Sequence, residues 1–136
     1  MSGLVFACIA PHGSMIVPAL AGEEGQKALT TRASMEELGR RMAAASPETV
    51  VLITPHGHRV DAVFSLLNNQ RVRGDLGPEK DTNENGIFLT FEVDKELNEA
   101  ILDAARAQEV PVTRIGYAVQ DDPTFCLPLD WGATVP

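Results

Sequence analysis

The chain has 136 residues, of which 44% are hydrophobic and 22% charged, and its formal net charge is −8. This size and balance fit one globular domain and exclude disordered, coiled-coil and collagen-like chains. The excess of acidic residues argues against nucleic acids and anionic membrane surfaces as partners. The two cysteines lie outside any Cys-x-x-Cys pattern and no targeting or membrane segment is visible, so we expect a cytoplasmic protein.

The first predicted element is the apolar run at residues 4–10, which is followed by a proline. Such a run is typical of a strand buried on both faces of a parallel sheet. Residues 22–32 are polar and mixed and are expected to form a loop. Ser34 and Glu37 have the spacing of a capping box, which predicts the start of a helix that Pro47 ends.

A second β-rich run at residues 49–54 follows this helix and is again ended by a proline. Strand, helix and strand predict a right-handed βαβ unit with both strands parallel in one sheet. A further strand is expected within residues 60–67. The stretch 68–86 is rich in glycine, asparagine and charges, which predicts a long exposed loop.

The last part of the chain predicts strands at 87–93 and 112–119 with a helix between them. Asp94 is the expected N-cap of this helix, and the tail from Gln120 is rich in turn residues. Together these elements predict an α/β fold with a mostly parallel central sheet and flanking helices.

Two of the three histidines share one context, because His12 and His56 both stand in Pro-His-Gly directly after a predicted strand. Ligands of open α/β sheets bind beyond the carboxyl ends of the strands. Neighbouring strands lie about 4.8 Å apart, so two imidazoles there can converge on one metal at about 2.0–2.2 Å. One such histidine alone is more often an exposed or backbone-bonded loop residue. His58 is a surface residue, an acid or base, or a group that supports the ligands.

A mononuclear Fe(II) site of this type joins two histidines to one carboxylate and leaves positions open for substrate and oxygen. The sequence does not identify that carboxylate. Imidazole suits several metals, so Zn(II) is an alternative to Fe(II). Four aspartates are candidates for the third ligand, although each also fits a turn or a cap: Asp61, Asp121, Asp122 and Asp130.

Three segments resemble, in the family's order, the LigB-type class III extradiol ring-cleavage dioxygenases, with Memo-type proteins as more distant relatives. They are Ile-Ala-Pro-His-Gly at 9–13, Thr-Pro-His-Gly at 54–57 and Leu-Asp-Trp-Gly-Ala-Thr-Val-Pro at 129–136. The resemblance covers essentially all of residues 1–136 and implies one LigB-like α/β domain, the N-terminal portion of the family's fold. It implies a non-haem Fe(II) enzyme that opens a catechol-type aromatic ring with both atoms of O2. His12 and His56 match the family's two histidine ligands.

The chain departs from the family pattern in two respects. Trp131 stands where many members carry a histidine, so it is a candidate for lining the pocket, beside His58 as a candidate catalytic residue. The resemblance also places a glutamate ligand and an acid/base histidine in a C-terminal part that this chain does not contain. The sheet edge and the apolar end near Val135 would then need either that segment or a partner, such as a second copy in a homo-oligomer.

These departures leave two functions of other classes open. One is a LigB-like domain that binds a small ligand or a protein partner without catalysis. The other is a Zn(II)-dependent hydrolase that uses the same histidines.

Overall fold

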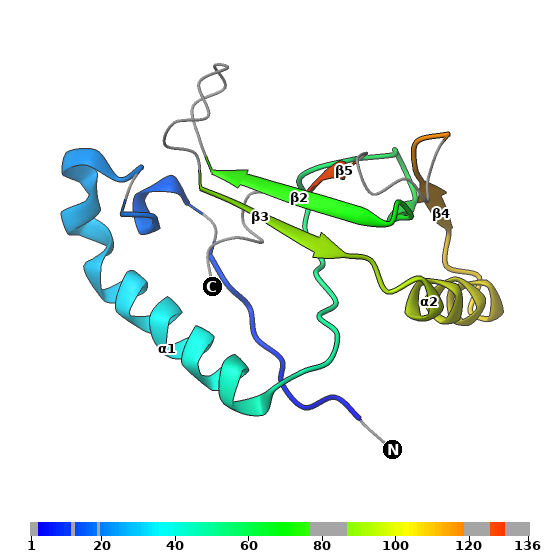
Figure 1. The fold of residues 1–136 in the computed structure, drawn as a ribbon, viewed down its shortest axis with the longest axis horizontal. Coiled ribbons are helices and arrows are strands. Elements are labelled where there is room, and N and C mark those ends of the chain that lie inside the picture. Colours follow the sequence, from blue (N-terminus) through cyan, green and yellow to red (C-terminus); the bar gives the residue numbers. More distant parts are fainter. Residues whose placement is uncertain (1–2, 12, 19, 77–86, 119–125, 130–136) are drawn as a thin grey trace. The chain divides into compact units, whose positions relative to one another are not determined.

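The structure is a computed structural model, and it describes residues 3–11, 13–18, 20–76, 87–118 and 126–129. The described residues fall into two compact units, an N-terminal unit up to Val51 and a C-terminal unit from Leu52 onward (Figure 1). None of the described helices is both long and apolar enough to cross a membrane.

The N-terminal unit is helical. It contains the 3-10 helices η1 (Ser14–Ile16) and η2 (Gly22–Ala28) and the α-helix α1 (Leu29–Ala45), and η2 runs directly into α1. Arg32 of α1 ties η1 to the helix, because its Nε atom donates to the carbonyl oxygen of Ile16 at 3.1 Å. The burial of Ile16 and Met35 gives this unit its small apolar core.

Three predictions for this part of the chain are wrong. Residues 22–32 are helical instead of a loop, and α1 begins before the predicted capping box. The Ser34 hydroxyl donates a hydrogen bond to the carbonyl oxygen of Thr30, one turn earlier in the helix, at 3.0 Å. Ser34 therefore lies inside α1 and does not cap its start. Residues 4–10 and 49–54 form no strand, since no described strand pairs with them. The predicted end of the helix before Pro47 is confirmed.

The C-terminal unit contains two small sheets. In the first, β1 (Phe64–Leu67) pairs in parallel with β4 (Val112–Ile115). In the second, β2 (Arg71–Leu76) lies between β3 (Ile87–Glu92), to which it is antiparallel, and β5 (Cys126–Leu129), to which it is parallel. Val72 and Leu127 are direct neighbours on β2 and β5, and both are buried, so they form the centre of this unit's core.

Helix α2 (Lys95–Ala107) follows β3 and contacts β4. Its start is confirmed as predicted, because the Asp94 carboxylate accepts a hydrogen bond from the N–H of Leu97 at 2.9 Å. Asn98 of α2 donates to the carbonyl oxygen of Leu67 at 2.8 Å, which fastens the helix to β1.

The α/β class is confirmed, with small parallel and mixed sheets among the described residues. Strands are found in the regions predicted at 60–67, 87–93 and 112–119. The predicted loop 68–86 is wrong for Arg71–Leu76, which forms β2, and β5 lies in the tail where only turns were expected. Both β2 and β5 pair with strands far away in the sequence, and local composition does not reveal such pairing.

Candidate functional site

The loop that carries the second Pro-His-Gly motif belongs to the C-terminal unit and forms a bend over residues 55–58. His56 is exposed, and its main-chain N–H donates to Oγ1 of Thr54 at 3.2 Å. Gly57 has a φ of 88°, a conformation that side-chain-bearing residues rarely adopt. The threonine and the glycine therefore fix the path of the backbone on either side of the His56 imidazole.

His58 is the half-buried histidine of this loop. Its carbonyl oxygen accepts a hydrogen bond from Oγ of Ser65 on β1 at 2.9 Å, which anchors the loop to the first sheet. Its Nε2 atom is buried and has no hydrogen-bond partner in the part of the chain that the structure describes. Burying a polar atom without a partner costs roughly 1–3 kcal/mol, so this nitrogen is a candidate contact for a bound group.

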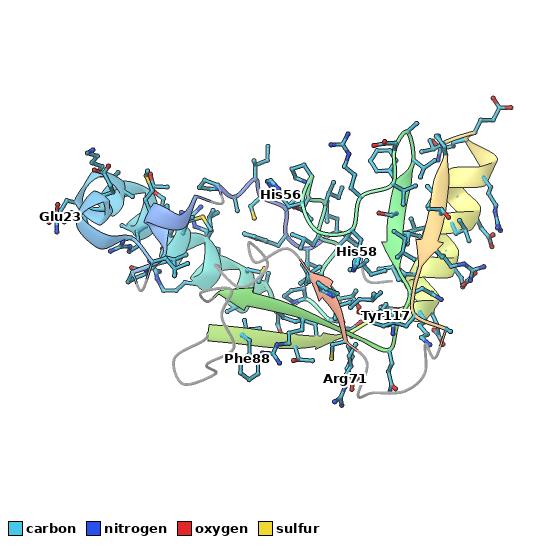
Figure 2. The ribbon with its side chains drawn as sticks, turned by 90° about the horizontal axis from the view of Figure 1, so that it is seen from above. Glu23, His56, His58, Arg71, Phe88 and Tyr117 are labelled. Atoms are coloured by element: carbon cyan, nitrogen blue, oxygen red, sulfur yellow. The ribbon has the colours of Figure 1, made fainter. Side chains whose placement is uncertain are left out.

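The side of the three-stranded sheet on which His58 lies can be seen directly (Figure 2). Figure 2 shows Arg71 and Phe88 projecting from one side of the sheet and His58 lying on the other. Because successive strand residues alternate between faces, Val72 points to the side on which His58 lies. His58 therefore lies on the same side of the sheet as the buried Val72 side chain.

Of the other predicted site residues, the structure describes only Asp61. Asp61 is exposed, and its Oδ1 atom lies 3.4 Å from Nε of Arg59 in a surface ion pair. Within the described ranges, no three His, Cys, Asp or Glu side chains are placed to hold a metal ion together. The remaining candidates lie outside the described residues: His12, Asp121, Asp122, Asp130 and Trp131.

The donors that the chain offers fit a metal such as Fe(II) or Zn(II) in their chemistry. The His56 imidazole is exposed, and a hydrogen bond to Thr54 holds its main chain. A neutral imidazole is a ligand that both metals accept. The side chains of Thr54 and Ser65 bond the main chain of this loop, at the N–H of His56 and the carbonyl oxygen of His58, and so hold the backbone from which the His56 imidazole projects.

Asn69 is a supporting residue that the sequence analysis missed. It follows β1, it is 0% exposed, and its Oδ1 atom accepts a hydrogen bond from the N–H of Tyr117 at 2.8 Å. Tyr117 follows β4, so this bond joins the carboxyl ends of the two parallel strands. The signal in the sequence is the asparagine pair at 68–69 between two β-rich runs, a pattern that is also typical of the start of a loop.

Comparisons with known proteins agree with these motifs. The family model "Catalytic LigB subunit of aromatic ring-opening dioxygenase" matches residues 6–136. Protein CA_C1420 of Clostridium acetobutylicum is 25% identical over 126 residues, which are 93% of this chain and 26% of that relative. The chain thus spans about a quarter of the length of the curated relative that it matches. No solved structure matches it significantly. The chain belongs to the LigB family.

Proposed function

We propose that this member of the LigB family supplies two metal ligands of a non-haem Fe(II) dioxygenase that opens a catechol-type aromatic ring with both atoms of O2. The observation that carries the proposal is the family match over residues 6–136, which includes both Pro-His-Gly motifs. In this proposal His12 and His56 bind the metal through neutral imidazole nitrogens, and a carboxylate completes the ligand set.

The iron, when bound, supplies a centre at which a catecholate and O2 lie side by side. The chain's own residues hold the ligands for that purpose. Gly57 sets the turn after His56, and Ser65 fastens the loop to β1. This bracing limits the loss of conformational freedom when His56 binds the metal.

His58 has a separate role in the proposal. Its buried Nε2 atom has no hydrogen-bond partner among the described residues and is a candidate for a hydrogen bond to an oxygen of the bound aromatic. Such a bond would orient the ring's hydroxyl groups relative to His56, two residues earlier in the same loop.

A second candidate function rests on Trp131. This residue stands where many family members carry a histidine, and an indole cannot exchange a proton at that position. It favours a LigB-like domain that binds an aromatic ligand without opening its ring. A Zn(II)-dependent hydrolase remains the third alternative, because imidazole ligands suit both metals.

The test is ring opening by the natural protein, reconstituted without oxygen with Fe(II) or with Zn(II). Catechol is then added with ¹⁸O-labelled O2, and the product is examined by absorbance and mass spectrometry. The proposal expects a ring-opened product that carries two ¹⁸O atoms. This product should form with Fe(II) but not with Zn(II), and it should not form in His56→Ala. Arg59→Ala is the matched control, because Arg59 is exposed in the same region and pairs with Asp61. Binding of catechol without turnover would support the second candidate instead.

A further inference from the structure

Strand β3 lies at one edge of the three-stranded sheet, whose order is β3-β2-β5, and no other described strand pairs with its outer side. Natural proteins protect such edges with lysine, proline or a bulge. The strand Ile-Phe-Leu-Thr-Phe-Glu has neither lysine nor proline, and its pairing with β2 is continuous. Three of its apolar side chains are exposed by 50%, 44% and 39%: Phe88, Leu89 and Phe91.

The hydrogen-bond pattern shows which groups of β3 point outward. The N–H of Val93 donates to the carbonyl oxygen of Gln70 at 3.0 Å, so this facing pair is hydrogen-bonded. In an antiparallel ladder hydrogen-bonded and non-hydrogen-bonded pairs alternate. In the observed register Phe88, Thr90 and Glu92 therefore stand at non-hydrogen-bonded positions. Their N–H and C=O groups point away from β2.

From this pattern we propose that β3 is a dimer interface, at which it pairs antiparallel with β3 of a second copy of the chain about a two-fold axis at Thr90. In that register Thr90 faces Thr90 of the copy, and Phe88 faces Glu92 of the copy. It is the symmetric register that pairs all three outward residues of one strand with all three of the other. The edge is thus complementary to itself, which an isologous interface requires. This interface is independent of the proposed metal chemistry.

The charges on this edge fit the same register. The Arg73 guanidinium lies 4.0 Å from the centre of the Phe88 ring, and Glu92 lies 3.5 Å from Arg71 on the neighbouring strand. Pairing Phe88 with Glu92 of the copy brings that carboxylate beside the ring on which Arg73 lies. No like charges of β3 face each other, so the chain's net charge of −8 is not concentrated at the contact.

On the opposite face, the same register places Leu89 against Phe91 of the copy. Both side chains lie on the face of the sheet that carries the buried Val72, and both are partly exposed in the single chain. Pairing the two copies would extend the apolar core across the two-fold axis.

The first test is the mass of the chain in solution by light scattering after size-exclusion chromatography. The proposal expects twice the single-chain mass for the natural sequence and the single-chain mass for Thr90→Pro, which removes the outward N–H at the axis. Thr90→Val keeps that N–H and is the matched control, so its dimer should persist. A single-chain mass for the natural sequence at every concentration tested overturns the proposal and indicates that another segment or partner covers this edge.

The second test is disulfide cross-linking in a background with Cys8→Ser and Cys126→Ser, and it remains decisive if Thr90→Pro does not fold. Residues facing each other in a hydrogen-bonded pair have Cα atoms about 5.5 Å apart, within the range of a disulfide. Thr90→Cys should therefore cross-link to its copy. Phe88→Cys should not, because four residues of offset separate its two Cα atoms by about 14 Å. Cross-linking of Phe88→Cys without Thr90→Cys would refute the register.

Discussion

The buried amide of Asn69 gives the sharpest stability prediction. Its side chain is 0% exposed, and its Oδ1 atom accepts the 2.8 Å hydrogen bond from Tyr117 that joins the ends of β1 and β4. Asn69→Ala removes the Oδ1 acceptor, so the N–H of Tyr117 loses its hydrogen bond. Loss of a fully buried amide together with its hydrogen bond costs about 1–3 kcal/mol, and we expect a loss of about 2 kcal/mol in the free energy of unfolding.

Urea denaturation followed by circular dichroism measures this loss. With an m-value of about 2 kcal/mol per M, a loss of about 2 kcal/mol lowers the urea midpoint by about 1 M. Gln108→Ala is the control, because Gln108 is exposed and its 3.4 Å bond to the carbonyl oxygen of Ala104 is long. This control should change the stability by less than about 0.5 kcal/mol. A change no larger in Asn69→Ala than in the control would refute the structural role given to the amide.

Three further predictions concern local features. Asp94→Ala should destabilise the chain by about 1 kcal/mol in urea denaturation, because the N–H of Leu97 loses its cap, whereas equal stability of the two forms would contradict the cap. Gly57→Ala should cost roughly 1–2 kcal/mol at its φ of 88°, and a stabilising effect would exclude that conformation. The hydrogen bond from Arg41 holds the pKa of Glu37 below its ordinary value of 4.5. This pair therefore stabilises the folded chain above the ordinary pKa, and its contribution is lost as the pH falls through the folded pKa. Carboxyl NMR titration should show Arg41→Gln raising the pKa of Glu37 toward 4.5, and an unchanged pKa would assign the shift to another group.

Features that depend on a few neighbouring residues could be predicted from the sequence. The Asp94 cap and the end of α1 before Pro47 are of this kind. The Ser34–Glu37 pattern misled because Ser34 bonds Thr30 within the helix, and Glu37 pairs with Arg41. A capping-box spacing inside a helix is the same as one at its start, so the pattern alone does not set the boundary.

Long-range pairing could not be predicted in this way. Strand β5 exists because it pairs with β2, far earlier in the chain, and its segment otherwise has the composition of a turn-rich tail. Conversely, residues 4–10 and 49–54 have strong strand composition but form no strand, and Ile9 and Ile53 are 97% and 83% exposed. A strand needs a partner, and hydrophobic composition does not supply one.

In the candidate site, too, the sequence predicts local motifs but not properties that depend on the fold. The repeated Pro-His-Gly motif predicts His56 as a metal ligand, which stays a prediction, and the structure adds the hydrogen bonds of Thr54 and Ser65 that hold the backbone of its loop. Nothing in the sequence indicated that Nε2 of His58 is buried without a partner. That property depends on the three-dimensional surroundings of the loop, which a motif does not encode.

The measurement that tests the central claim most directly is an anaerobic Fe(II) titration of the natural protein, compared with His12→Ala, His56→Ala and the double variant. If both histidines bind one iron, each single variant should lose as much affinity as the double variant, since one missing ligand already breaks the shared site. Arg59→Ala should bind iron like the natural sequence. Unchanged iron binding in either histidine variant, with the fold preserved in circular dichroism, would contradict the claim that His12 and His56 form one metal centre.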